Sequence, residues 1–62
     1  MLTEERFSKI LSIIEEKGSA TVQELMLALD ASESTIRRDL NAMDDNGLLT
    51  KVHGGAIAKR QK

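Results

Sequence analysis

The chain has 62 residues, a net charge of −1 and no cysteine, and Phe7 is its only aromatic residue. This length supports one domain at most, and its core must form from aliphatic side chains without a disulfide or a thiolate-bound metal. No apolar run reaches the length of a membrane span and no signal-peptide pattern opens the chain, so we expect a cytoplasmic protein without a membrane partner.

The first predicted helix covers residues 4–17. Thr3 can cap it, and Glu4 and Glu5 in the first turn suit the positive end of the helix dipole. Gly18 follows as a natural left-handed stop. Apolar residues at the i, i+3, i+4 and i+7 positions form one stripe, made of Phe7, Ile10, Leu11 and Ile14.

Residues 19–21 are long enough for one extended pairing segment, and a second helix is predicted over 22–29. Thr21 and Glu24 have the spacing of a capping box, in which each side chain accepts from the other residue's backbone N–H. Leu27 points away from the apolar stripe and is either a singly exposed leucine or a contact to a partner chain. The inward face of this helix consists of Val22, Leu25, Met26 and Leu29.

A third helix is predicted over 33–46, after a tight connection at residues 30–31. Ser32 can cap its start, and Asn46 and Gly47 end it because both residue types tolerate the left-handed conformation. The residues that fall within a narrow arc and face the core are Ile36, Leu40 and Met43.

Two short strands follow at 48–52 and 56–58, joined by a glycine-rich turn at 53–55. The order of these elements predicts a mostly α domain over residues 1–58 with a small β wing. This is a winged helix-turn-helix, in which a three-helix core carries a two-stranded hairpin. Residues 59–62 form a polar, basic tail.

The charges are divided unevenly along the chain. Residues 1–35 carry three basic and seven acidic groups, whereas residues 36–62 carry six basic and three acidic ones. Because phosphate binding depends on the local potential of one face, the basic C-terminal half outweighs the overall charge.

The outer face of the third helix suits the major groove of DNA. At about 100° per residue from Ile36, the residues about 140–200° away include Ser34, Arg38 and Asn41, and Thr35 and Arg37 flank them. Arginine can donate two bonds to guanine and asparagine can pair with adenine, while hydroxyls and N–H groups at a helix start suit phosphates. The candidate DNA-binding residues are Ser32, Ser34, Thr35, Arg37, Arg38 and Asn41 on this helix, and Lys51, His53 and Gly54 on the wing.

Several alternatives stay open at this point. One of Arg37 and Arg38 is expected to read bases and the other to hold a phosphate, and the order is not decided. In an arbitrary protein, an arginine pair on a helix is more often a solvated face, and the acids at positions 39, 44 and 45 could neutralise it here. Asp39 lies beside the apolar stripe and would repel phosphate, which favours an ion pair with an unidentified basic side chain inside the domain.

On the wing, Lys51 and His53 flank glycines that allow close approach of the backbone to another surface. A phosphate contact is favoured for Lys51. For His53, a contact to phosphate or to the minor groove and a purely structural place in the hairpin are equally compatible with the sequence. An enzyme is disfavoured, since one histidine and no metal-ligand or phosphate-loop spacing are present. A protein–protein module is the alternative, and RNA binding would more often show exposed aromatic residues.

Three stretches together resemble the N-terminal domain of the DeoR family of bacterial transcriptional regulators. They are Ser-Glu-Ser-Thr-Ile-Arg-Arg-Asp-Leu at 32–40, Asn-Gly-Leu-Leu at 46–49 and Val-His-Gly-Gly-Ala at 52–56. Arg6 and the helix at 21–29 also fit, so the resemblance covers about residues 2–57. One departure is Asp30, where helix-turn-helix units generally favour glycine.

The resemblance implies a repressor of a sugar-catabolism operon whose partner is double-stranded operator DNA. It further implies a C-terminal domain, absent from these 62 residues, that senses a phosphorylated sugar and makes the full-length protein a homo-oligomer. The tail at 59–62 would lead into that domain, and no cofactor is expected in the present part. The family's contact positions correspond to Ser34, Thr35, Arg37, Arg38, Lys51, His53 and Gly54.

Overall fold

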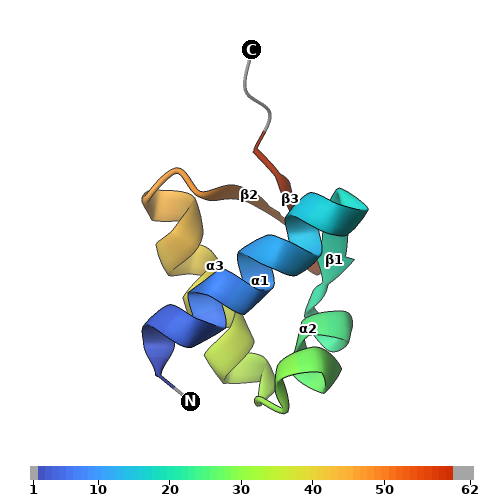
Figure 1. The fold of residues 1–62 in the computed structure, drawn as a ribbon, viewed down its shortest axis with the longest axis vertical. Coiled ribbons are helices and arrows are strands. Elements are labelled where there is room, and N and C mark those ends of the chain that lie inside the picture. Colours follow the sequence, from blue (N-terminus) through green and yellow to red (C-terminus); the bar gives the residue numbers. More distant parts are fainter. Residues whose placement is uncertain (1, 60–62) are drawn as a thin grey trace.

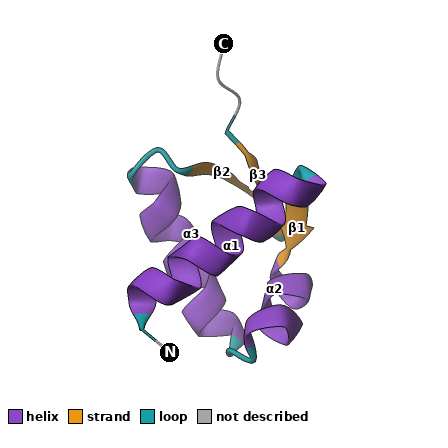
Figure 2. Ribbon diagram, in the orientation of Figure 1, coloured by secondary structure: helices purple, strands orange, loops and turns teal. Residues whose placement is uncertain are grey.

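The computed structural model describes residues 2–59 and confirms a mostly helical winged helix-turn-helix. Figures 1 and 2 show the helices packed together, with a small sheet beside them. In the described part, no helix has the length and apolar character needed to cross a membrane. The elements are α1 (Thr3–Lys17), β1 (Ser19–Thr21), α2 (Val22–Leu29), α3 (Glu33–Asp45), β2 (Leu49–Val52) and β3 (Gly55–Ala58).

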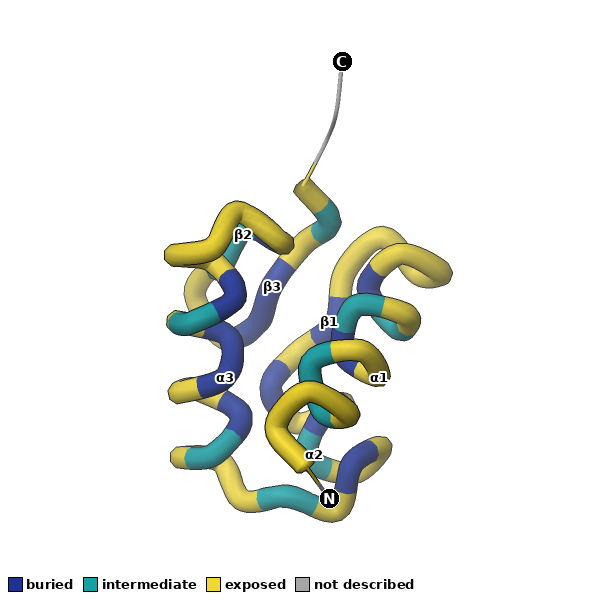
Figure 3. Tube along the Cα trace, turned by 60° about the vertical axis from the view of Figure 1, so that its left-hand side comes forward, coloured by how far each residue is buried: buried dark blue, intermediate teal, exposed yellow. Residues whose placement is uncertain are grey.

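The core is aliphatic and draws on all three helices and the sheet. Figure 3 shows the buried positions of α3 turned toward α1 and α2, with its exposed positions on the outside. Phe7, Leu11 and Met26, which the apolar pattern assigns to the inward faces, are only partly buried and pack against the core edge. Leu27 points outward as predicted, with 85% of its surface exposed. The largest fully buried side chains are Ile10, Ile14, Leu25, Ile36, Leu40, Met43 and Leu49.

The sheet has three antiparallel strands in the order β1-β3-β2 rather than a separate two-stranded hairpin. β3 lies in the middle, where Ala56 is opposite Ala20 of β1 and Lys51 of β2. The predicted extended segment at 19–21 therefore completes the same sheet that carries the wing. Both strand starts differ by one residue from the prediction, because β2 begins at Leu49 and β3 begins at Gly55.

The wing turn consists of two residues, not three. Val52 pairs with Gly55, which leaves His53 and Gly54 as the turn, and Gly54 has a φ of 81°. A positive φ at the second turn position is the pattern of a type II turn, which favours glycine there. Gly55 belongs to the ladder instead, and its role is a close contact with β1.

The start of α1 and the end of α3 differ slightly from the sequence-based prediction. Leu2 occupies the N-cap position of α1 and its N–H donates to the Glu5 carboxylate at 3.3 Å, so Thr3 is the first helical residue and not the cap. A glutamate at the third helical position can serve the cap N–H in this way. α3 ends at Asp45, and Leu48 N–H bonds back to the Met43 carbonyl at 2.9 Å.

The tight connection between α2 and α3 forms with aspartate in place of glycine. Asp30 adopts a φ of 54°, in the left-handed region, and the Ala31 N–H donates to the Met26 carbonyl at 3.1 Å. Aspartate tolerates this conformation better than most residues with a side chain. The predicted helix-turn-helix connection is thus confirmed. Of the tail at 59–62, only Lys59 is described and it is exposed, while residues 60–62 lie outside the described part.

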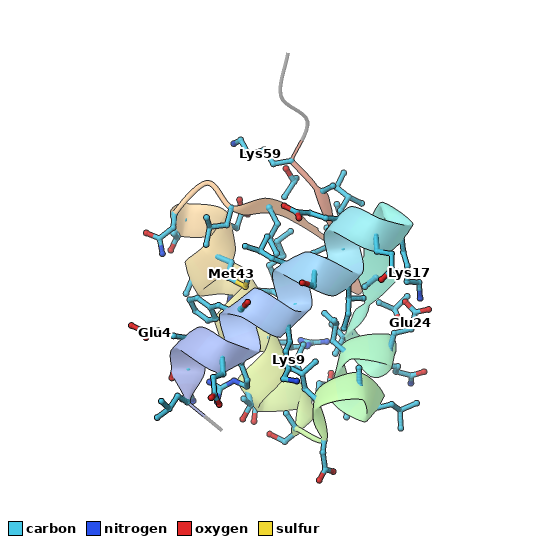
Figure 4. The ribbon with its side chains drawn as sticks, in the orientation of Figure 1. Glu4, Lys9, Lys17, Glu24, Met43 and Lys59 are labelled. Carbon is cyan, nitrogen blue, oxygen red and sulfur yellow. The ribbon has the colours of Figure 1, made fainter. Side chains whose placement is uncertain are left out.

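The start of α2 carries the predicted capping box and an added ion pair. Glu24 N–H donates to the Thr21 hydroxyl at 3.1 Å, and Thr21 N–H donates to the Glu24 carboxylate at 3.0 Å. At the end of α1, the Lys17 Nζ lies 2.8 Å from an oxygen of the same carboxylate (Figure 4). The hydrogen bond from Lys17, followed by that from Thr21, lowers the pKa of Glu24 below its ordinary value of 4.5.

A lowered pKa makes stability dependent on pH in the acid range. The folded state binds the Glu24 proton less readily than the unfolded chain, so this stabilisation is present above about pH 4.5 and is lost as the pH falls through the folded pKa. Glu24→Gln keeps a cap acceptor but removes the ionisable group. In chemical unfolding, the stability advantage of the unmodified protein over this variant should shrink as the pH falls below 4.5.

Lys17→Met provides the matched control for this pH dependence, because Lys17 supplies the largest contribution to the lowered pKa. That variant should show a weaker loss of stability over the same pH range. An advantage over Glu24→Gln that stays constant on acidification would contradict the assignment.

Candidate nucleic-acid interface

The first turn of α3 is organised by hydroxyl groups. The Ser32 hydroxyl accepts the Thr35 N–H at 3.3 Å and donates to the Thr35 hydroxyl at 3.0 Å. The Ser34 hydroxyl lies 3.4 Å from that of Ser32. Ser32 and Thr35 therefore hold the helix start as well as being predicted DNA contacts, and Thr35 is half-buried.

Three predicted contact residues share the outermost face of α3. Ser34, Arg38 and Asn41 are exposed and, at about 100° per residue, lie opposite the buried residues of the helix. Arg38 makes no ion pair with any other residue in the range 2–59. The outer face thus offers a hydroxyl, a guanidinium and an amide at one surface.

Arg37 has a different environment from its neighbour. Its guanidinium lies 3.0 Å from the Glu33 carboxylate, one helical turn earlier, and both side chains are more than half exposed. Within residues 2–59, none of the aspartates at positions 39, 44 and 45 forms an ion pair with Arg37 or Arg38. The partial neutralisation of this face comes from Glu33 instead.

Asp39 has the structural role that its position predicts, and its partner is Arg6 of α1. The Arg6 Nε lies 2.5 Å from one carboxylate oxygen and a terminal nitrogen lies 3.1 Å from the other. Only 4% of Asp39 is exposed. The hydrogen bond to Asp39 raises the pKa of Arg6, against a smaller opposing effect of desolvation. This two-point contact holds α3 against α1 and keeps Asp39 away from the outer face.

The wing and α3 meet at a surface hollow of about 130 Å³, which we call the wing notch. Gly54 of the turn accepts a hydrogen bond from the Val22 N–H at 2.9 Å, so the turn is attached to the first residue of α2. The notch brings together the predicted contact side chains of Arg37, from α3, and of Lys51 and His53, from the wing. The residues that line the notch are Val22, Arg37, Lys51, His53, Gly54 and Gly55.

A second hollow adjoins the notch and contains residues that the sequence reasoning missed. Gln23 and Glu33 line it together with Arg37, between the start of α2 and the start of α3. The capping box at Thr21 could have indicated Gln23 as a site residue. It marks the start of a helix, and Gln23 is an exposed polar residue in the first turn of that helix. No cluster of potential metal ligands occurs in the described part of the chain.

These features define a class of protein. A helix with a polar outer face follows a bracing helix across a tight turn, and a cationic wing lies beside it on the same side. This is the arrangement of winged helix-turn-helix domains, which place the second helix of the unit in the major groove.

Comparison with known proteins identifies the family. The DeoR-like helix-turn-helix domain matches residues 6–62, and the chain belongs to this family. It is 47% identical over 53 residues to the HTH-type transcriptional regulator GolR of Listeria innocua, covering 86% of this chain and 21% of that protein. It is 50% identical over 56 residues to an uncharacterized HTH-type transcriptional regulator, FruR, of Bacillus subtilis, covering 90% and 22%.

A third relative is the lactose phosphotransferase system repressor of Lactococcus lactis, 47% identical over 51 residues, with 82% of this chain and 20% of that protein covered. The chain therefore spans about a fifth of the length of the curated relatives it matches. No solved structure matches the chain.

Proposed function

We propose that this domain recognises operator DNA for a bacterial transcriptional regulator, with α3 in the major groove and the wing notch against the flanking phosphates. The observation that carries the proposal is that Arg37 of α3, adjacent in sequence to the exposed Arg38, lines the wing notch together with Lys51 and His53 of the wing. Hydroxyl, amide and guanidinium groups can form hydrogen bonds with base edges and with phosphates, and lysine can bind phosphate through its positive charge.

The role of the whole regulator extends this proposal. Related proteins carry names such as lactose phosphotransferase system repressor, which supports a cytoplasmic repressor of a sugar-catabolism operon. Because those relatives are about four times as long as this chain, we propose an additional domain that binds a phosphorylated sugar and joins subunits into a homo-oligomer. Two domains in one oligomer would place two α3 helices in successive major grooves and raise the affinity.

The proposed function is tested by titrating the 62-residue chain with duplex DNA at several salt concentrations. Binding should weaken as salt rises, with a log–log slope set by the number of phosphates contacted. Lys51→Ala should reduce that slope by about one and weaken binding to all sequences alike. Lys51 is chosen because its side chain lines the notch.

Lys9→Ala is the matched control for the loss of one positive charge. Lys9 extends from α1 and borders a hollow between α1 and α2, apart from the wing notch (Figure 4). This variant should bind DNA almost as the unmodified chain does. Equal losses for Lys9→Ala and Lys51→Ala would place the contact elsewhere, and an absence of duplex binding at low salt would refute the proposed function.

A further inference from the structure

The two adjacent arginines of α3 differ in partners and direction. Arg37 is paired with Glu33 at 3.0 Å and lines the wing notch beside Lys51 and His53. Arg38 lies about 100° further round the helix, because successive helical residues are separated by this angle. It borders neither the notch nor the adjoining hollow, and it shares the outermost face with Ser34 and Asn41.

We propose that Arg38 reads base edges, that Arg37 binds a backbone phosphate in the wing notch, and that Glu33 positions Arg37 for this contact. This inference rests on the proposed function and assigns separate roles within it. It makes Arg38 the residue that determines specificity. Glu33 becomes a positioning residue that acts through Arg37.

The direction of each side chain supports this division. When a helix lies in the major groove, the residues opposite its buried side face the base edges on the groove floor, and residues turned to one flank face the phosphates of the groove wall. Arg38 is in the first position. Arg37 is in the second, on the flank where the wing meets the helix.

The charges at the notch favour an anion there. Arg37 and Lys51 bring two positive charges to one small hollow, and the imidazole of His53 adds a further hydrogen-bonding group. A phosphate oxygen in the notch could accept charge-assisted hydrogen bonds from both side chains. Phosphate contacts fix the register of a protein on DNA without reading its sequence.

Glu33 fits a positioning role because of its geometry. A carboxylate facing DNA would by itself repel phosphate, yet this one holds the Arg37 guanidinium at 3.0 Å beside the notch. A guanidinium has five N–H donors, so Arg37 can keep the carboxylate and still donate to a phosphate. The ion pair favours the side-chain direction that places the Arg37 guanidinium beside the notch.

The test begins with duplexes selected by the unmodified chain from a random pool, compared with unselected duplexes. Arg38→Ala should weaken binding to the selected duplex by about 10-fold to 100-fold and remove the preference at one base pair, with little loss on unselected DNA. Arg37→Ala should weaken both kinds of duplex by the same factor and reduce the salt slope by about one. The exposure of both arginines makes a folding defect unexpected, and circular dichroism of each variant verifies this.

The positioning role of Glu33 is tested by a double-mutant cycle. Glu33→Gln should change the salt slope when Arg37 is present and have a smaller effect on it in the Arg37→Ala background. In the Arg38→Ala background, the effect of Glu33→Gln on the slope should be unchanged. Equal effects of Glu33→Gln in all three backgrounds would overturn the positioning role.

The outcomes separate this inference from the proposed function. Loss of base preference with Arg37→Ala, or a uniform loss with Arg38→Ala, would overturn the division of roles while leaving DNA binding intact. An unmodified chain that binds duplexes without any preference would also overturn a base-reading Arg38. A complete lack of binding to duplex DNA would refute the proposed function, and this inference with it.

Discussion

Replacing Gly55 with alanine is expected to destabilise the domain by about 3 kcal/mol, enough to unfold much of a protein this small. A Cβ atom at this position would lie 2.3 Å from the Ala20 carbonyl oxygen and 2.9 Å from the Thr21 Cα. Both are backbone atoms and neither can turn aside like a flexible side chain. The clash is therefore relieved only if β1 separates from β3, which breaks the centre of the sheet.

Gly47→Ala is the matched control for this substitution. Gly47 has a φ of 75°, and a Cβ atom added there would have nothing within 4 Å, so its replacement adds backbone strain but no clash. The expected loss is about 1–2 kcal/mol. Urea unfolding of both variants measures the difference, and equal losses would show that the contact between β1 and β3 adapts more readily than its geometry indicates.

Asp39→Ala is expected to lower the free energy of unfolding by about 2–3 kcal/mol, because it removes the carboxylate from a largely buried two-point contact. Arg6 keeps its charge after this change but loses both bonds to α3. Asp39 is 4% exposed, so water replaces its carboxylate poorly. Thermal or urea unfolding provides the measurement, and the m-value should stay the same if the fold persists.

Two further variants separate the ion pair from a general effect of charge on α3. Asp45→Ala removes an exposed aspartate from the same helix and should change stability by no more than about 0.5 kcal/mol. Replacing both partners, Arg6→Met with Asp39→Leu, should recover part of the loss because no charge is then left without its partner. If the double variant were less stable than Asp39→Ala, the buried charge would not be the source of the loss.

The sequence predicts those parts of the fold that depend on local chemistry. The helices at 22–29 and 33–45 lie within a residue of their predicted bounds because their starts are capped by Thr21 and Ser32 through short-range hydrogen bonds. The predicted cap of α1 at Thr3 is wrong, because Leu2 occupies the cap position. Its N–H donates to the Glu5 carboxylate, and a leucine cap of this kind leaves only a weak signal in the sequence.

Features that depend on distant parts of the chain could not be predicted. The helical pattern places Asp39 beside the core, but its partner Arg6 is 33 positions away and only the packing of α1 on α3 brings them together. In the same way, two successive glycines suggest a turn, whereas Gly55 is required by the approach of β1. The pairing of residues 19–21 with 55–57 has no local signature.

In the candidate site, too, the features with a local signal in the sequence could be predicted, and those that depend on distant contacts could not. Helical periodicity correctly places Ser34, Arg38 and Asn41 on an exposed face, and the four-residue spacing of Glu33 and Arg37 is a local signal that could have indicated their ion pair. The notch was not predictable, because it forms only where the wing turn attaches to the first residue of α2. DNA contact by these residues stays a prediction for the titrations above.

The position of β3 has a consequence for how the protein is made. Among the described residues, the strand at the centre of the sheet comes last in sequence, and it must enter between two strands that precede it. During synthesis, β1 emerges early but lacks its hydrogen-bonding partner until the segment after the wing turn has left the ribosome. Because domains fold as units, the contacts among the three helices become stable only when β3 completes the sheet. That step encloses most of the described residues between the two paired segments, so the pairing of β3 completes the domain.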